Sequence, residues 1–295
     1  MEIASPIEVE LKLALATEYL TILLSHPILA AAPHLEQHLS NTYFDTPTDD
    51  LANARVAVRL RQAGDVIVQT VKTAGQGGGG MSSRQEWEWQ VPSLHIDQQA
   101  LSELPPFQGR LGAAITHLTP TLNTDFTRRG WKIEWQESLI EMVLDEGEIV
   151  TGGAQVPICE LELELKMGQP EALWSLALHL AEQVPLRPSD TSKAARGNSL
   201  AAKRWPLPTA TTAMEWLHRA TVALDAYHDS GQHEHLRVAQ QALSQLAIHP
   251  QLDDDLRPVA QQLPKELSAH GLPSAAYGHA ALMLAHRLAS QTALR

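Results

Sequence analysis

The sequence holds little cysteine and few aromatic residues, and it contains no long hydrophobic run. Its one cysteine, Cys159, has no partner within the chain, which excludes an internal disulfide and is typical of proteins from a reducing compartment. No segment reaches the roughly 20 apolar residues that a membrane-spanning helix needs. The N-terminus lacks the basic start and apolar stretch of a signal peptide. We therefore expect a cytoplasmic protein with no membrane partner.

Basic residues are in the minority. Lys and Arg together number 22 against 34 Asp and Glu, which gives a net charge of −12. Such an acidic surface repels nucleic acid over most of its area, so we do not expect nucleic acid as a partner. Any phosphate ligand must instead be held by a local cluster of basic side chains.

A change in character near residue 205 divides the chain of 295 residues. Before this point short alternating segments and turn residues dominate, whereas the later part is rich in Ala, Leu and Gln with helical spacing. The two prolines of Trp205-Pro206-Leu207-Pro208 predict a stiff linker. We predict a first domain at 1–207 and a small all-α region at 208–295, with helices near 210–229, 233–247, 252–270 and 274–292.

The first domain is predicted to be mostly β, with helices near 16–25 and 170–184. Asp145-Glu146-Gly147 indicates a turn, and the glycines at 77–80 indicate a mobile hairpin loop and not a P-loop, since no Gly-Lys-Ser/Thr follows them. Eight strands are enough to close a barrel. We therefore predict an α+β protein with flanking helices around a closed eight-stranded antiparallel β-barrel, its strands near 7–13, 55–61, 66–72, 84–91, 122–128, 131–136, 139–145 and 158–166.

Charged and apolar residues alternate along the predicted strands. In Ile7-Glu8-Val9-Glu10-Leu11-Lys12-Leu13 the charged side chains share one face, because successive side chains of a strand point to opposite faces. For one strand alone, a solvated sheet face over a hydrophobic core explains the pattern. The pattern recurs along the chain, however, at Arg59 and Arg61, Lys72, Arg84, Glu86 and Glu88, Arg128, and Glu160, Glu162 and Glu164.

If the charged faces of these strands point into the barrel, the charges indicate a binding site for ligands. A lumen with both signs of charge is costly to fold unless a ligand and a metal compensate it. Three carboxylates at positions i, i+2 and i+4 repel one another, and a bound cation offsets that repulsion. Acidic side chains supply hard oxygen ligands for Mg²⁺ or Mn²⁺, while Arg and Lys bind phosphate. The combination indicates metal-assisted phosphoryl transfer.

In this order the charged residues resemble those of CYTH proteins, also called triphosphate tunnel metalloenzymes. Glu8-Val9-Glu10-Leu11-Lys12 resembles the ExExK signature of that family. The segments at 157–165 and 192–197 are similar to those of the bacterial two-domain inorganic triphosphatases. The resemblance implies a closed eight-stranded antiparallel barrel around a charged tunnel. It also implies a C-terminal helical region of the CHAD type, which here is shortened, and for which we expect barrel support or homodimer formation.

The resemblance implies a role for each matching residue. The basic residues expected to bind phosphate and to act in catalysis are Lys12, Arg59, Arg61, Lys72, Arg128 and Lys193, joined in substrate binding by Arg84. The expected ligands of Mg²⁺ or Mn²⁺ are Glu8, Glu10, Glu86, Asp145, Glu160, Glu162 and Glu164. The glutamate run leaves open which two of Glu160, Glu162 and Glu164 bind metal. Arg129 is expected to point outward, and Arg196 to hold the C-terminal end of the barrel.

The function predicted from these residues is metal-dependent hydrolysis of inorganic triphosphate, or of another short polyphosphate, to pyrophosphate and phosphate. Thiamine triphosphatase and class IV adenylyl cyclase are alternatives within the family. The tryptophans at 87, 89, 131 and 135 indicate packing under helices and do not decide between them. A polyphosphate-binding module without turnover is an alternative outside the enzymes.

Overall fold

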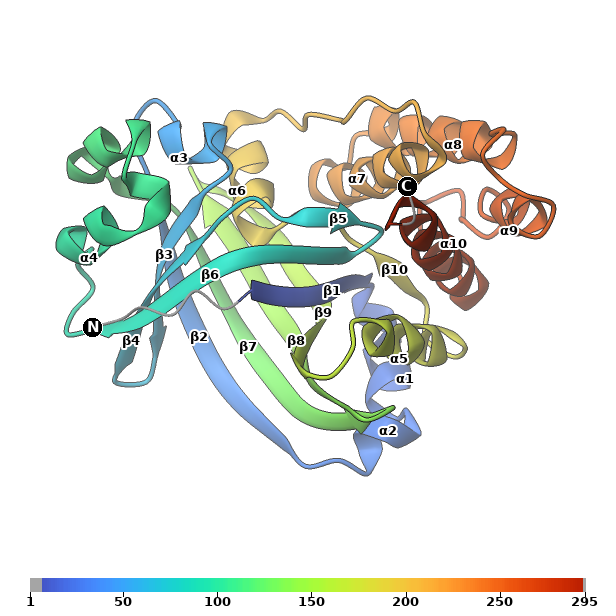
Figure 1. Cartoon of the computed structure of the whole chain (residues 1–295), viewed down its shortest axis with the longest axis horizontal. Coiled ribbons are helices and arrows are strands. Elements are labelled where there is room, and N and C mark those ends of the chain that lie inside the picture. Colours follow the sequence, from blue (N-terminus) through green and yellow to red (C-terminus); the bar gives the residue numbers. More distant parts are fainter. Residues whose placement is uncertain (1–6, 294–295) are drawn as a thin grey trace.

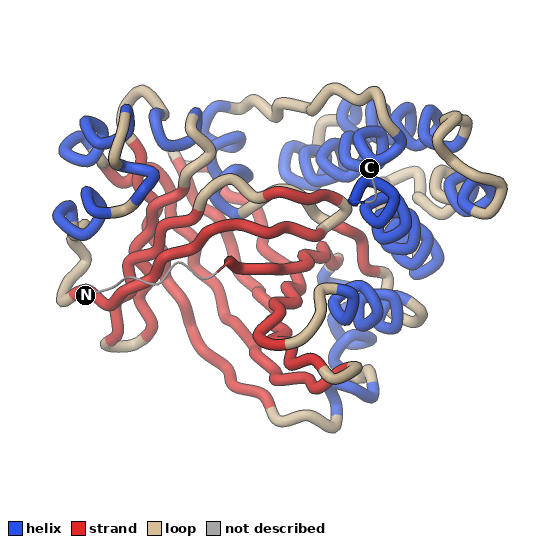
Figure 2. The backbone as a smooth tube through the Cα atoms, viewed as in Figure 1, coloured by secondary structure: helices blue, strands red, loops and turns tan. Residues whose placement is uncertain are grey.

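The alternating segments fold into a closed antiparallel β-barrel in the computed structural model, which describes residues 7–293 (Figures 1 and 2). Going around the barrel the order is β1-β9-β8-β7-β2-β3-β4-β6, and β6 pairs with β1 to close it. The predicted fold is thereby confirmed. The eight barrel strands are β1 (Ile7–Leu15), β2 (His34–Asp45), β3 (Ala57–Ala63), β4 (Val66–Lys72), β6 (Met81–Val91), β7 (Thr119–Trp135), β8 (Ser138–Thr151) and β9 (Ala154–Met167).

Two short strands extend the sheet where the barrel closes. The first half of β1 pairs with β6, and its second half pairs with β10 (Leu186–Pro188). The strand β5 (Gln76–Gly78) pairs with the start of β6. Between these pairings the Lys12 amide donates a hydrogen bond to the carbonyl of Gly80 at 2.8 Å. Strand β1 therefore carries its charged residues through the centre of this junction.

Apolar side chains on the outer face of the barrel pack under helices, as alternation requires. One cluster joins outward residues of β1, β7, β8 and β9 to α5 (Glu171–Ala181) and to α1 (Leu20–Leu24) and α2 (Pro27–Ala30). A second lies between β3, β4 and β6 and the covering segments α4 (Gln98–Glu103), η2 (Pro105–Phe107) and η3 (Arg110–His117), close to α3 (Asp50–Asn53). Trp87 and Trp89 belong to the second cluster, which confirms their predicted packing role.

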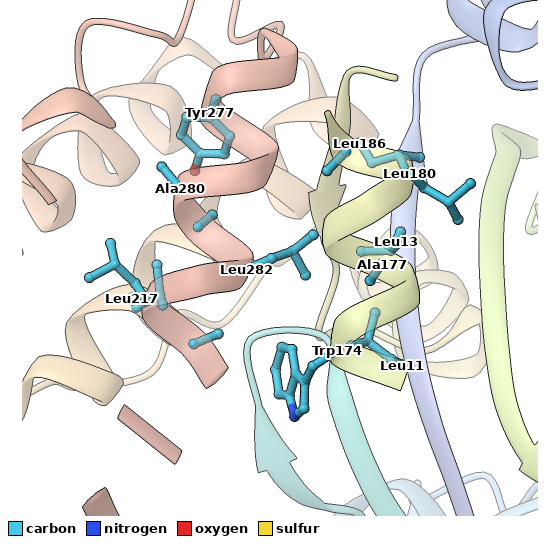
Figure 3. Packing of buried hydrophobic residues seen from close by; sticks show 14 of the residues in the cluster. Leu11, Leu13, Trp174, Ala177, Leu180, Leu186, Leu217, Tyr277, Ala280 and Leu282 are labelled. Carbon is cyan, nitrogen blue, oxygen red and sulfur yellow. The ribbon is translucent and has the colours of Figure 1, made fainter. Parts of the chain in front are cut away.

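The C-terminal part contains α7 (Ala213–Ser230), α8 (His233–Ala247), α9 (Leu256–Gln262) and α10 (Ala275–Ala293). Leu217 and Leu282 of this part belong to the same hydrophobic cluster as Leu11 and Leu13 of the barrel and Trp174 of α5 (Figure 3). The helices therefore dock on the barrel through a shared core, while the domain boundary at 207 stays a prediction. None of the helices described is both long and apolar enough to span a membrane.

Several predicted elements were wrong. Strand β2 was not predicted, and the segments at 122–128 and 131–136 form one continuous strand, β7. The residues of the predicted turn at 145–147 lie inside strand β8. Gly147 is needed there because a neighbouring strand approaches closely: a Cβ at this position would lie 2.5 Å from the Cβ of Phe126. The single helix predicted at 16–25 is broken into η1 (Thr17–Tyr19) and α1, and 252–270 contains only the short α9.

Candidate functional site

The inward faces of the barrel strands enclose a cavity of about 1290 Å³. The alternation along each strand predicted correctly which charged side chains face the inside of the barrel, because successive residues of a strand point to opposite faces. Two predicted residues, Asp145 and Glu160, do not line the cavity, because they are buried beneath it at 0% and 2% exposure. The predicted residues that line it are Glu8, Glu10, Lys12, Arg59, Arg61, Lys72, Arg84, Glu86, Arg128, Glu162, Glu164 and Lys193.

An apolar plug inside the barrel, built around Phe126, Leu122, Ile149 and Ile158, lies below this cavity. The guanidinium of Arg128 and the ammonium of Lys193 lie 5.7 and 5.1 Å from the centre of the Phe126 ring. Helix α6 (Lys193–Ala202) packs on the plug, and Gly197 permits a close approach to Leu122. Charges next to this plug are poorly screened by water, so their mutual pairing is strong.

Lys193 contacts all three carboxylates of a buried cluster above the plug. One ligand oxygen each of Asp145, Glu160 and Glu162 lie within 4.8 Å of one another, a spacing that could hold a metal ion. The Lys193 ammonium lies 2.7 Å from Asp145 and 3.0 Å from Glu162, and it also contacts Glu160. Its position follows from the helix start, where the Ser192 side chain caps α6.

Arg128 adds a second cation to the same cluster. Its guanidinium makes two 2.7 Å hydrogen bonds to Asp145 and one of 2.9 Å to Glu162. Burial alone would raise the pKa of Glu162, but Lys193 and Arg128 outweigh it and hold that pKa well below its ordinary value. The carboxylates of this cluster are therefore paired with protein cations.

A second cluster surrounds Glu8 at the junction of β1 and β6. Lys72 lies 2.9 Å from both Glu8 and Glu86, and Arg84 lies 2.7 Å from Glu8 and 2.5 Å from Glu10. Burial opposes ionisation of both Glu8 and Glu86. Lys72 and Arg84 nevertheless lower the pKa of Glu8 to about 2, whereas the pKa of Glu86 is raised to about 7 by burial and by the Glu8 charge.

Strand register brings three further carboxylates into one row. Glu10 of β1 lies opposite Glu164 of β9, and Glu164 lies opposite Glu141 of β8. Like charges directly opposite one another are destabilising. Burial raises the pKa of Glu164 above its ordinary value, although Lys166, 2.6 Å away, lowers it; the charges of Glu8 and Glu141 act with burial. Because Glu8, Glu10, Glu162 and Glu164 offer carboxylate oxygens to the cavity, their chemistry fits a hard divalent cation.

Three arginines crowd the opposite part of the cavity wall. Burial, together with the charges of Arg59 and Arg128, lowers the pKa of Arg61 to about 10. Arg61 donates to Asn41 at 2.9 Å, a neutral partner, and Nε of Arg59 is buried without a hydrogen-bond partner. Arg59 lies 3.5 Å from Glu88, whose side chain is 45% exposed. Crowded guanidinium groups with unused donors favour binding of a multiply charged anion.

A family model described as the CYTH domain matches residues 6–197, more than half of the chain. The chain belongs to the CYTH family. It is 34% identical over 203 residues to an inorganic triphosphatase of Haemophilus influenzae, a match that covers 67% of this chain and 56% of that protein. The chain thus spans about half the length of this curated relative.

A solved structure has the same fold. A protein from Hippeastrum, described as a candidate adenylyl cyclase with a dominant triphosphatase activity, superposes with a TM-score of 0.51 at 20% identity. The match covers 68% of this chain and 98% of the Hippeastrum chain. A Pyrococcus horikoshii protein matches at a TM-score of 0.44 and 19% identity, over 64% of this chain and 96% of its own. At these identities the likeness concerns the fold alone.

The CYTH barrel also confirms two residues predicted to lie outside the site. Arg129 points away from the cavity and pairs with Glu36 at 2.9 Å and Glu146 at 3.3 Å. Arg196 donates to Asp229 of α7 at 2.7 Å and to the Pro157 carbonyl at 2.6 Å, so it joins the barrel to the C-terminal helices.

Sequence reasoning missed several residues of the cavity. Tyr43, which lines the cavity and is hydrogen-bonded to Arg59, and Asn41, which accepts from the cavity residue Arg61, both lie on β2, the strand that was not predicted. The alternating residues 39, 41 and 43, which share one face of a strand, are the sequence signal that would have identified them. Lys12 donates to the Thr191 carbonyl at 2.5 Å, and His218 of α7 reaches the cavity wall from the C-terminal region. No local pattern marks the last two contacts, because they depend on packing between distant segments.

Proposed function

We propose that this CYTH protein is a metal-dependent inorganic triphosphatase that hydrolyses tripolyphosphate to pyrophosphate and phosphate. The observation that carries the proposal is one cavity with crowded arginines on one part of its wall and a row of carboxylates on another. A linear polyphosphate matches the first group by charge, and a divalent cation matches the second. The similarity to the H. influenzae triphosphatase supports the same reaction.

The basic residues hold the substrate in this proposal. Arg59, Arg61 and Arg128 present planar guanidinium groups suited to bidentate contacts with phosphate oxygens. Substrate oxygens would relieve the mutual repulsion of these arginines, which favours binding. The remaining substrate-binding residues are Lys12, Lys72, Arg84 and Lys193, each already oriented by an acidic side chain or a carbonyl of the barrel.

The acidic residues hold the metal. We assign Glu8, Glu10, Glu162 and Glu164 as its ligands, since these face the cavity. Asp145 and Glu160 are assigned instead to the orientation of Lys193 and Arg128, because both contact these cations and are buried without lining the cavity. A bound Mg²⁺ or Mn²⁺ would neutralise phosphate charge and polarise the phosphoryl group.

Hydrolysis also needs a group that takes a proton from water. Water oxygen forms a bond to the terminal phosphorus, the bridging P–O bond breaks, and pyrophosphate leaves. Glu86 faces the cavity with a pKa of about 7, raised by burial and by Glu8. A general base works best with a pKa near the working pH. We therefore assign Glu86 as the proton acceptor.

The alternatives fit the cavity less well. Thiamine triphosphate and ATP carry rings that need an open aromatic face, as in stacking. Among the described residues that line the cavity, the aromatic ones besides His218 are Tyr43 and Trp89, which are only 7% and 8% exposed. A binding module without turnover would need no carboxylates facing the substrate, whereas Glu10 and Glu164 do so here. Homodimer formation and a cytoplasmic location stay predictions.

Steady-state kinetics test the proposal. Phosphate release from tripolyphosphate, thiamine triphosphate and ATP is measured with Mg²⁺, with Mn²⁺ and in EDTA, for the wild type, Lys72→Ala and Glu162→Gln. Lys132→Ala, an exposed residue of β7, is the matched control. We expect fast metal-dependent release from tripolyphosphate that both cavity variants lose by at least about a hundredfold, with the control unchanged. Faster turnover of ATP or thiamine triphosphate would change the substrate, and no turnover at all would leave a binding module.

A further inference from the structure

Part of the cavity wall comes from beyond the barrel. His218 and Val222 of α7 line the cavity together with Pro206, Leu207 and Pro208 of the segment before it. Helices α7 and α10 lie beside the turn between β5 and β6 (Figure 1). The side chain of His218 is 36% exposed, and its Nδ1 lies 2.6 Å from Asp190. An ionisable side chain of the C-terminal region thus faces the proposed substrate.

The contact of His218 is made with a well-fixed segment. Asp190 also accepts hydrogen bonds from the amides of Gly80 at 2.7 Å and Gly79 at 3.3 Å. The neighbouring Thr191 carbonyl accepts from the Lys12 ammonium at 2.5 Å. His218 and Lys12 are therefore held by adjacent residues of one segment.

Asp225, about two helical turns after His218 on α7, holds the same segment in place. It is 5% exposed and accepts hydrogen bonds from Arg187 at 2.5 Å, from Ser189 Oγ at 3.1 Å, and from the Asp190 and Thr191 amides at 3.3 and 3.2 Å. A fully paired buried carboxylate of this kind orders the groups around it. Helix α7 thus sets the position of both His218 and the carbonyl that orients Lys12.

The charges around His218 favour its protonated form. The hydrogen bond to Asp190 raises the pKa of His218; burial lowers it, the charges of Asp190 and Asp225 raise it, and Arg55 lowers it. On its own helix Arg219 donates to the Pro208 carbonyl. The turn between β5 and β6 carries no charged residue. With Nδ1 donating to Asp190, a protonated ring has Nε2–H as its remaining donor.

We propose that His218 is a phosphate-binding residue of the tunnel, supplied by the C-terminal helices and oriented by Asp190. Its ligand is a phosphate group of tripolyphosphate or of a longer linear polyphosphate, which accepts a charge-assisted hydrogen bond from Nε2–H. The proposal rests on the proposed function, since it assumes a polyphosphate in this cavity. It gives the C-terminal region a role in substrate binding in addition to support of the barrel.

The sign of the pH dependence follows from the chemistry of the ring. A phosphate oxygen is an acceptor, so only the protonated ring binds it; neutral His218 donates through Nδ1 to Asp190 and has a lone pair at Nε2. The contribution of His218 is therefore present at low pH and lost as the pH rises through its pKa. Removing His218 should weaken binding most at acidic pH.

Calorimetric binding of tripolyphosphate in EDTA tests this without turnover, at pH 6.0 and pH 8.5. The variants are His218→Gln and Asp190→Asn, and the control is His270→Gln, an exposed histidine of the same region. We expect His218→Gln to raise the Kd about three- to tenfold at pH 6.0 and less than twofold at pH 8.5, given partial solvent screening. Asp190→Asn, which keeps an acceptor but removes the charge, should raise the Kd at pH 6.0 in the same direction.

The proposal would be overturned by an equal Kd for the wild type and both cavity variants at pH 6.0, or by no binding of tripolyphosphate to the wild type. An equal loss in His270→Gln would also overturn it, since the effect would then be unspecific. If the wild type binds tripolyphosphate but releases no phosphate with Mg²⁺ or Mn²⁺, the proposed function fails while the comparison of Kd values still decides the role of His218.

Discussion

Replacing Lys193 with Met tests whether an ammonium group is the cation that holds the buried carboxylates together. Lys193 is 7% exposed and contacts Asp145, Glu160 and Glu162. Met keeps the length of the side chain and removes its charge. Removing one partner of a buried ion pair costs about 3–5 kcal/mol, because a charge is left without a partner. Since Arg128 still pairs with two of the three carboxylates, we expect a loss near the lower end, about 3 kcal/mol.

The loss should depend on pH, and its sign follows from Glu162. The folded-state pKa of Glu162 lies well below its ordinary value, after Lys193 and Arg128 outweigh burial. This depression contributes stability that is present above the unfolded pKa of about 4.3 and is lost as the pH falls further. In the variant the depression is reduced and the carboxylates accept protons more readily. The difference in unfolding free energy is therefore expected to be complete at neutral pH and to shrink as the pH falls below about 4.3.

Urea unfolding followed by circular dichroism at pH 7.5 and at about pH 3.5 measures both effects. Lys166→Met is the control, because Lys166 is 39% exposed and pairs with Glu141 and Glu164 near the solvent. A pair at such a site contributes about 0–1 kcal/mol. The reasoning is refuted if Lys193→Met costs no more than Lys166→Met at pH 7.5, or if its cost is the same at both values of pH.

Two further predictions concern Glu86 and the glycine turn. The pKa of Glu86 is raised to about 7, above its ordinary 4.5. In EDTA, the stability of the wild type relative to Glu86→Gln should therefore fall as the pH rises from about 4.5 to 7. Urea midpoints of the two proteins that change with pH by the same amount would contradict this. Gly79→Ala should lower stability by about 2–4 kcal/mol, because Gly79 has a φ of +66° and a Cβ there would clash with Ala285 of α10. Gly64→Ala, with a φ of +59° and open space, should cost only about 1 kcal/mol; equal melting temperatures for the two glycine variants would argue against docking of the turn on α10.

The number of barrel strands was predictable from alternation, but two errors compensated in reaching it. Counting β7 as two strands added one, and missing β2 removed one. The first half of β2 is exposed and polar, so its hydrophobic period is weak. Gly147 led to the opposite error, because a glycine inside a strand, needed here for the close approach of the Asp125–Phe126 backbone, looks like a turn residue in the sequence.

The charged wall of the site was the most predictable part. A strand period of two assigns a face to every residue once one residue is placed, so Glu8, Arg59 and Lys72 could be grouped without a structure. The depth of each residue along the barrel could not be predicted, because it depends on register between strands. The register of the folded sheet, such as the pairing of Glu10 with Glu164, shows which carboxylates meet across it.

The contacts between the barrel and the C-terminal helices could not be predicted from the sequence. The glycine turn at 77–80, expected to be a mobile loop, is held by Asp190 and by contact with α10. Buried Asp225 is one position in a helix whose other residues follow an ordinary apolar pattern. Such groups are identified only when the partner segment is known.

The central claim is that the cavity hydrolyses tripolyphosphate with a divalent cation. A ³¹P NMR time course of tripolyphosphate with the wild-type protein and Mg²⁺ tests it most directly. The account predicts that the tripolyphosphate signals decay while one pyrophosphate and one phosphate appear for each substrate molecule, and that EDTA stops the reaction. Intact tripolyphosphate in the presence of Mg²⁺, or the same rate of cleavage in EDTA, would contradict it.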